Sequence, residues 1–183
     1  LSFTIRHLNA VSGDMFSASH NLPTDNGKKV YDQYGGQLIP PQDQFLVDEV
    51  TRNVEDIRTM PFEEACTQGL VEMIGPEIDQ AYQDAVIPLS LSAARKIKIL
   101  YAPLHGTGLT SVHPILEKLG FDIVLDPHTA NLSGAFENVT FNIPNPEVQQ
   151  SFDTSLSATR EATADLIFST DPDADRIGVM LNQ

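Results

Sequence analysis

The second half of the chain alternates short apolar runs with segments of helical spacing, and this alternation constrains the fold more than any other feature. Three strands are predicted there, at residues 97–101, 121–125 and 166–169. Two helices are predicted between them, over residues 112–119, where Gly120 ends the helix, and over residues 146–163. Strand, helix, strand, helix, strand with apolar strands predicts a parallel, doubly wound α/β unit.

An acidic loop follows the last of these strands. It reads Ser-Thr-Asp-Pro-Asp-Ala-Asp-Arg over residues 169–176, and its carboxylates belong to Asp171, Asp173 and Asp175. Apolar runs flank it, so a loop between two short strands turns all three carboxylates toward one point. Like charges at such spacing repel strongly in a low dielectric, which favours a hard divalent cation with oxygen ligands, such as Mg²⁺. The alternative interpretation is a solvated acidic turn.

A second loop is expected at the same edge of the sheet. In doubly wound sheets, ligands bind outside the carboxyl ends of the strands. The acidic loop leaves such an end, and so does Pro-Leu-His-Gly-Thr-Gly, residues 103–108, after the first strand. For His105, a direct role and a structural role that holds the glycine turn both stay open.

The first half of the chain shows a looser pattern. Helical or strand character is predicted for residues 2–9 (helix), 13–18 (strand), 28–39 (hairpin), 41–57 (helix) and, as three short helices, 62–70, 76–85 and 89–95. Asn26-Gly27 is a strong turn signal between the strand and the hairpin. The short helices are expected to lead into a second domain.

Composition excludes several classes of protein. The chain of 183 residues holds 11 Lys and Arg against 25 Asp and Glu, a formal net charge of −14. Such acidity argues against a nucleic-acid-binding protein and against a basic membrane-surface protein. A single cysteine, Cys66, and the lack of an apolar run of roughly 18 residues favour a cytoplasmic protein with no membrane partner.

A loop in the first half of the chain contains a serine that is a candidate partner of the acidic loop. Ser17-Ala18-Ser19-His20-Asn21 follows a predicted strand and places a hydroxyl beside an imidazole. Taken alone, it is more simply a hydrogen-bonded loop. A phosphate on the serine would add close to −2 of charge, which together with three carboxylates would exceed what one divalent cation offsets. Lys29, Arg176 and His20 are the groups that would then offset the rest.

Together the serine loop with Asn26-Gly27-Lys28-Lys29, residues 103–108 and residues 171–176 resemble the α-D-phosphohexomutase family, which comprises phosphoglucomutases, phosphomannomutases and phosphopentomutases. The resemblance implies an α/β fold of two consecutive mixed or parallel-sheet domains. Residues 1–92 would form the C-terminal part of domain 1, truncated at its N-terminus, and residues 93–183 domain 2. One departure is Leu22, which stands where the family usually has the proline that follows Ser-His-Asn.

The resemblance also implies roles for individual residues. Ser19 would be the phosphorylated serine, and His20 would orient it. Mg²⁺ would be bound by Asp171, Asp173 and Asp175, with an oxygen of phosphorylated Ser19 completing the site. Arg176 would contact the phosphate or the reacting sugar. Lys29, ten residues after Ser19, would be the general base.

The implied activity is an intramolecular phosphotransferase, an isomerase that moves a phosphoryl group between the C1 and C6 (or C5) hydroxyls of a hexose or pentose phosphate. A phosphoglucomutase or phosphomannomutase is the expected type. The family's third and fourth domains carry the loops that hold the sugar, and this sequence lacks them. The remaining domains of a parent chain are therefore expected partners, and the isolated chain is expected to be inactive.

Other interpretations of the acidic loop remain. An inert metal- or phosphate-binding fragment is one, and a phosphatase of the haloacid-dehalogenase type, with an aspartyl nucleophile in Asp-x-Asp, is another. The phosphatase would leave the Ser19 loop and Lys29 without a role. An EF-hand is excluded, because its sixth and twelfth positions require Gly and Glu, and Arg176 and Asn182 stand there.

Overall fold

The computed structural model describes residues 1–181, and they divide into two compact units. One unit comprises Leu1–Met15 and Lys28–Tyr82, and the other comprises Phe16–Gly27 and the chain from Gln83 onward. The serine loop therefore belongs to the same unit as the acidic loop, although it lies far from it in the sequence. The domain boundary expected between residues 92 and 93 stays a prediction.

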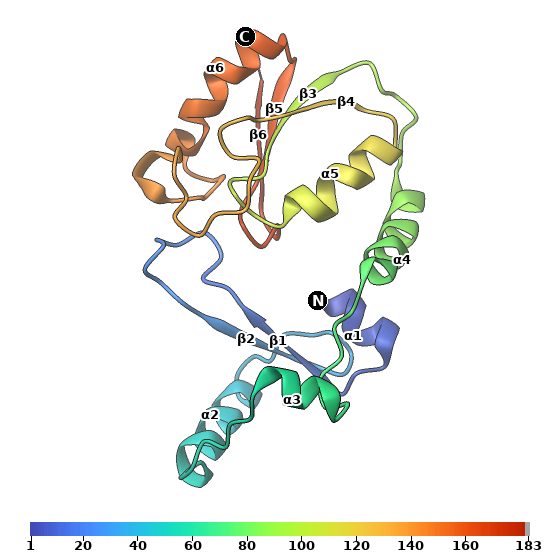
Figure 1. Cartoon of the computed structure of the whole chain (residues 1–183). Coiled ribbons are helices and arrows are strands. Elements are labelled where there is room, and N and C mark those ends of the chain that lie inside the picture. Colours follow the sequence, from blue (N-terminus) through green and yellow to red (C-terminus); the bar gives the residue numbers. More distant parts are fainter. Residues whose placement is uncertain (182–183) are drawn as a thin grey trace. The chain divides into compact units, whose positions relative to one another are not determined.

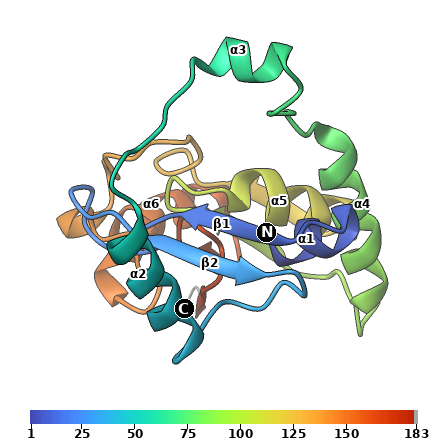
Figure 2. The same ribbon diagram turned by 90° about the horizontal axis from the view of Figure 1, so that it is seen from below.

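The first unit is built on a small two-stranded sheet of β1 (Ser12–Phe16) and β2 (Lys28–Asp32), which Figure 2 shows side by side. Its helices are α1 (Ser2–Leu8), α2 (Gln42–Asn53), α3 (Phe62–Thr67) and the first part of α4 (Pro76–Val86). Ile5 of α1 is buried against Gly13, where a Cβ atom would lie 2.6 Å from the Ile5 side chain. Beyond β2, the carboxylate of Asp32 accepts the N–H groups of Tyr34 and Gly36 and so stabilises the predicted turn.

Three helix predictions in this region are wrong. The helix expected over residues 62–70 ends at Thr67. The helix expected to reach residue 57 ends at Asn53. No helix forms over residues 89–95: one 3₁₀ turn, η1 (Ile87–Leu89), is followed by irregular chain. The guanidinium of Arg95 donates instead to the carbonyl oxygens of Ser92, Ala94 and Leu119, which compensates backbone groups that a helix would otherwise pair.

The second unit contains a four-stranded sheet with the order β4-β3-β5-β6. Its strands are β3 (Lys98–Ala102), β4 (Asp122–Leu125), β5 (Leu166–Thr170) and β6 (Ile177–Leu181). β3 pairs in parallel with β4 and β5, whereas β6 returns antiparallel to β5. The predicted α/β class with a mixed or parallel sheet is confirmed.

Helices α5 (Gly108–Lys118) and α6 (Asp153–Ala162) lie on opposite sides of this sheet (Figure 1). The α6 side carries the core, made of Leu100, Ala102, Phe152, Ala158, Ala164 and Ile167. Burying a large apolar side chain such as Ile167 contributes roughly 1.5–3 kcal/mol, so this cluster anchors β3 and β5. Within residues 1–181, no helix has both the length and the apolar character needed to cross a membrane.

The helix predicted over residues 146–163 begins later than expected, at Asp153. The side chain of Asn145 accepts the N–H of Glu147 in a local turn, and a 3₁₀ segment, η3 (Gln149–Phe152), precedes α6. A further 3₁₀ turn, η2 (Thr140–Asn142), lies in the long loop before it. The turn at Asn145 thus competes with the first turns of the predicted helix.

The loops that leave β3 and β5 are bound to each other. The backbone N–H and the hydroxyl of Thr107 both donate to the carbonyl of Pro172, at 2.8 and 3.0 Å. Gly106 permits this approach, because a Cβ atom there would lie 2.3 Å from the Pro172 Cα. The first turn after β3 therefore positions the acidic loop.

Replacing Gly106 with Ala should destabilise the chain by about 1–3 kcal/mol, because the added methyl group overlaps rigid backbone. Urea unfolding measures the change, with Gly134→Ala as the matched control, since a Cβ atom at Gly134 meets nothing within 4 Å. Equal stability of the two variants would contradict the assigned role of Gly106.

Candidate functional site

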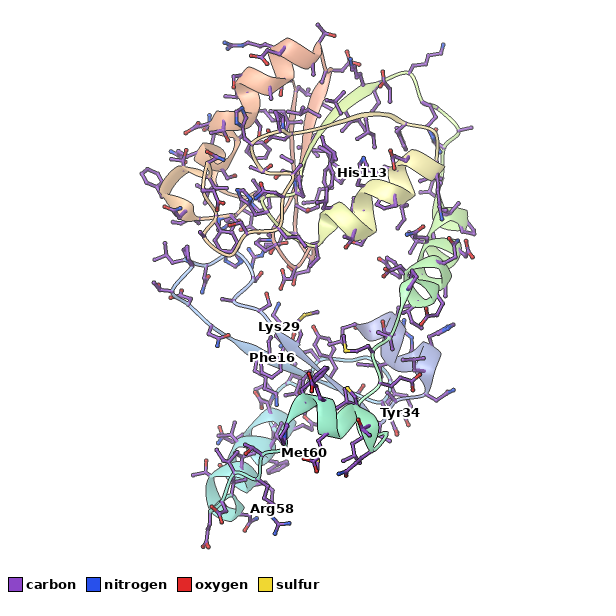
Figure 3. The ribbon with its side chains drawn as sticks, in the orientation of Figure 1. Phe16, Lys29, Tyr34, Arg58, Met60 and His113 are labelled. Atoms are coloured by element: carbon purple, nitrogen blue, oxygen red, sulfur yellow. The ribbon has the colours of Figure 1, made fainter. Side chains whose placement is uncertain are left out.

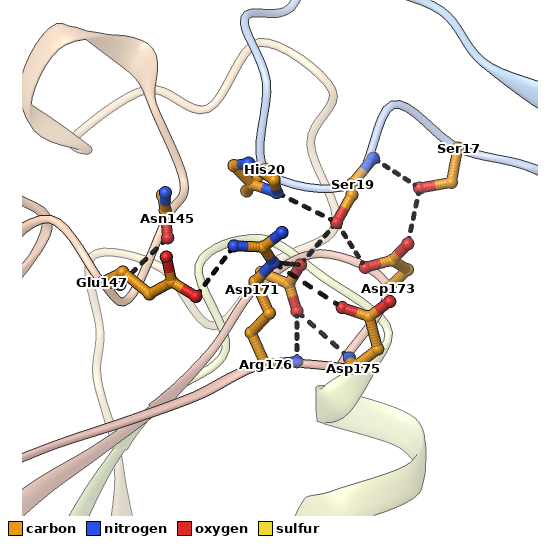
Figure 4. Close-up of polar contacts among 9 residues, drawn as sticks. All are labelled: Ser17, Ser19, His20, Asn145, Glu147, Asp171, Asp173, Asp175 and Arg176. Atoms are coloured by element: carbon orange, nitrogen blue, oxygen red, sulfur yellow. Dashed lines mark hydrogen bonds and ion pairs between the residues drawn. The ribbon is translucent and has the colours of Figure 1, made fainter.

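The acidic loop brings its three carboxylates together at the end of β5 (Figure 4). Ligand oxygens of Asp171, Asp173 and Asp175 all lie within 4.8 Å of one another. Asp171 is completely buried, and its Oδ1 accepts the N–H groups of Asp175 at 3.1 Å and Arg176 at 3.0 Å. These two bonds fold the loop back on its first residue.

Electrostatic repulsion is strong at this point. Burial raises the pKa of Asp171 to about 6, and the neighbouring carboxylate of Asp173 acts in the same direction. Hydrogen bonds from the Ser19 hydroxyl and from the backbone of Arg176 oppose this rise. A hard cation with oxygen ligands would relieve the repulsion, so the donor set fits a divalent metal ion.

The serine loop places Ser19 against the same carboxylates. The Ser19 Oγ lies 2.7 Å from Oδ2 of Asp171 and 3.0 Å from Oδ1 of Asp173. One hydroxyl carries one proton, so it serves only one of these carboxylates at a time. Ser19 adopts a left-handed conformation with φ 55°, a strained state for a residue other than glycine, which its contacts must maintain.

Two neighbours hold Ser19 in place. The Ser17 hydroxyl accepts the N–H of Ser19 at 2.8 Å and donates to Oδ2 of Asp173 at 3.2 Å. Nδ1 of His20 lies 3.2 Å from the Ser19 Oγ, and the orienting role of His20 stays a prediction. Ser17 was not predicted as a site residue, although its position two residues before Ser19 indicates the same side of the loop.

Arg176 closes the site on its other side. Its Nη1 donates to Oε1 of Glu147 at 2.9 Å, and its Nε lies 3.9 Å from Oδ2 of Asp171 and 4.0 Å from Oδ1 of Asp175. Sequence reasoning missed Glu147. The only signal was its place in the loop before α6, which says nothing of a partner 29 residues away.

Comparison with known proteins now decides the family. Residues 80–183 match α/β/α domain II of phosphoglucomutase/phosphomannomutase, and residues 1–56 match α/β/α domain I. The chain belongs to the phosphoglucomutase/phosphomannomutase family. The family resemblance inferred from the three motifs is confirmed.

Individual relatives agree with this family. The chain is 34% identical to a phosphoglucomutase of Staphylococcus saprophyticus, over 97% of this chain and 33% of the relative, and 32% identical to a phosphoribomutase of Saccharomyces cerevisiae, over 97% and 31%. A crystal structure from Thermus thermophilus, named for phosphomannomutase, superposes with a TM-score of 0.78 at 26% identity and covers 99% of this chain and 39% of its own. The chain thus spans about a third of the length of these curated relatives.

Two other predicted residues, Lys29 and His105, have the following surroundings. In this family member, Lys29 belongs to the first unit, on β2, where Figure 3 labels it. It is half-buried there and lines a cavity of about 190 Å³. His105 is buried, and its ring nitrogens face the carbonyl oxygens of Asn131, at 3.0 Å, and Glu137. These contacts favour the structural interpretation of His105, which ties the long loop after β4 to the end of β3.

A small cavity adjoins the serine loop. It has a volume of about 240 Å³ and is lined by His20, Asn21, Leu22, Asp25 and Ile143. Leu22, the departure from the usual family sequence, thus contributes to the wall of a space next to the serine loop.

Replacing Asp171 with Asn should stabilise the metal-free chain at pH 8 much more than at pH 4. The folded-state pKa is raised, so folding of the ionised carboxyl is disfavoured above about pH 6, and the penalty disappears as the pH falls through 4. The expected gain at pH 8 is on the order of 2 kcal/mol. Asn retains an acceptor for the two backbone N–H groups.

Urea unfolding in the presence of EDTA measures this difference at both pH values. Asp122→Asn, at an exposed position of β4, is the control that removes an equal charge without burial. If Asp171→Asn and Asp122→Asn change stability alike at pH 8, the repulsion assigned to the acidic loop is wrong.

Proposed function

We propose that this chain is the phosphoryl-carrying part of a phosphosugar mutase, with Ser19 as the phosphorylated residue. The single observation that supports this most is the position of the Ser19 Oγ, within 3.0 Å of two carboxylates of one three-aspartate loop. A structural serine gains nothing from a cluster of carboxylates beside it. A serine that carries a phosphate does, because the carboxylates bind the cation that offsets the charge of the phosphate.

Mg²⁺ is the proposed metal ion. Asp171, Asp173 and Asp175 would hold it together with an oxygen on Ser19, a set of oxygen donors that suits a hard cation. When bound, the ion supplies Lewis-acid polarisation and offsets negative charge. The raised pKa of Asp171 supports this assignment, because it reflects burial and repulsion between the ionised carboxylates when no cation is bound.

The protein's own residues then have separate tasks. Phosphorylated Ser19 breaks its Oγ–P bond as a sugar hydroxyl oxygen bonds to the same phosphorus, and the hydroxyl proton passes to a base. Lys29 is the proposed base, from its place in the family motif. His20, 3.2 Å from the Ser19 Oγ, orients the serine, and Arg176 offsets charge on the phosphate.

The reaction would continue in the reverse sense at the sugar's other phosphate. The bisphosphate formed on the first transfer reorients, and its second phosphoryl group returns to Ser19, which leaves the phosphate moved between C1 and C6, or C5. Relatives named phosphoglucomutase and phosphoribomutase support hexose or pentose phosphates as the substrate class. Residues 1–92 and 93–183 would be the two domains, and the cytoplasm is the proposed location.

The isolated chain is proposed to lack turnover. It spans about a third of the length of its curated relatives, and groups that bind the sugar would come from further domains. Phosphate and metal binding, by contrast, need only residues of the second unit.

Ser19→Ala should abolish phosphate incorporation into the complete protein from a hexose 1,6-bisphosphate, and with it mutase turnover, because no other hydroxyl replaces the acceptor. Ser17→Ala is the matched control in the same loop: it removes the bond to Asp173 but leaves the acceptor oxygen. Intact-mass and peptide mass spectrometry locate the phosphate. Phosphate on Ser17, or full turnover in Ser19→Ala, would overturn the proposed function.

A further inference from the structure

The ion pair between Glu147 and Arg176 has no part in the function proposed above. Nη1 of Arg176 donates to Oε1 of Glu147 at 2.9 Å, while the nearest atoms of Asp171 and Asp175 lie 3.9 and 4.0 Å from its Nε. Among these three carboxylates, Glu147 therefore holds the shortest bond to the guanidinium. Figure 4 draws this ion pair.

We infer that Glu147 is a positioning residue that holds Arg176 while Ser19 is unphosphorylated and yields it to the phosphate when Ser19 is phosphorylated. This inference rests on the proposed function. It assigns Glu147 no contact with the sugar and no proton transfer.

Packing brings Glu147 to this position. The side chain of Asn145 accepts the N–H of Glu147 at 2.9 Å, and Pro146 is buried. Gly178, two residues after Arg176 on β6, lets the loop approach: a Cβ atom there would lie 2.7 Å from the carbonyl oxygen of Pro146. Glu147 is thus held beside Arg176 by its backbone, while its side chain extends into solvent.

The exposure of this ion pair allows Arg176 to change its partner easily, and it means that the pair stabilises the fold little. The Glu147 side chain is 64% exposed and that of Arg176 is 34% exposed. Such exposed pairs contribute little to the free energy of folding, so the guanidinium leaves Glu147 without a large penalty. A stable buried pair would not release it.

The guanidinium also lies next to the place where the phosphate would form. Oδ2 of Asp171 is 3.9 Å from Nε of Arg176 and 2.7 Å from Oγ of Ser19, so both groups adjoin the same oxygen. A phosphoserine carries close to −2 of charge and three acceptor oxygens, against −1 and two on Glu147. Arginine binds phosphate in a bidentate manner, so the phosphate should bind the guanidinium in place of Glu147.

The test is nuclear magnetic resonance of the Arg176 guanidinium in this chain, unphosphorylated and with phosphoserine installed at position 19 during translation. Arg176→Lys assigns the signals. In the unphosphorylated chain, Glu147→Gln should accelerate exchange of the guanidinium protons with water about two- to fivefold, the range of an exposed ion pair. With phosphoserine 19, the same substitution should change the exchange by less than the error of the measurement.

Two further variants sharpen this test. Glu161→Gln removes an exposed carboxylate from α6 and should leave Arg176 unchanged in both states. Gly178→Ala should displace Pro146 and so reproduce the effect of Glu147→Gln while Glu147 is still present. An equal effect of Glu147→Gln in both states, or no effect in either, would overturn the inference, and so would loss of the folded state in Glu147→Gln.

Failure of the proposed function remains distinguishable from failure of this inference. If a hexose 1,6-bisphosphate never phosphorylates Ser19 of the complete protein, the mutase proposal fails. Whether Arg176 changes its partner from Glu147 to the phosphate is still tested on the chain with installed phosphoserine. That measurement needs neither substrate nor turnover.

Discussion

Repulsion among the carboxylates at the end of β5 is the interaction on which the rest of the site depends. Asp171 is wholly buried and close to Asp173, and its pKa rises to about 6 in consequence. A fold tolerates such a cluster only where neighbouring groups compensate it. Here the compensation comes from backbone N–H groups, from the hydroxyls of Ser17 and Ser19 and from the guanidinium of Arg176.

The scaffold around the cluster serves to hold this arrangement. Parallel pairing of β3 with β5 sets two loops at the same edge of the sheet, and Gly106 lets them touch through Thr107 and Pro172. The serine loop belongs to the same compact unit as the acidic loop, and the strained conformation of Ser19 is maintained by its hydrogen bonds to Ser17, Asp171 and Asp173. Strain at such a position is typical of sites where geometry matters more than local stability.

Much of this could be predicted from the sequence because the informative residues are close together in it. Three aspartates at alternate positions after an apolar run indicate both a strand end and a metal site. The strands β3, β4 and β5 follow from short apolar runs in the same way. The predicted helix over residues 89–95 failed because Arg95 bonds to the carbonyl of Leu119, a contact that no local pattern contains. Glu147 was missed for the same reason, since only the close approach of Pro146 to Gly178 brings it to Arg176.

The most direct test of this account is calorimetric titration of the chain with Mg²⁺ at pH 8. If the acidic loop is a cation site, one ion binds per chain, and Asp173→Asn weakens the affinity by at least about tenfold, since it removes one negative charge from the set of oxygen ligands. Asp122→Asn, which removes the same charge from an exposed position on β4, should leave the affinity unchanged. Absence of saturable binding, or equal affinities for the two variants, would contradict the central claim that these carboxylates are held together to bind a cation.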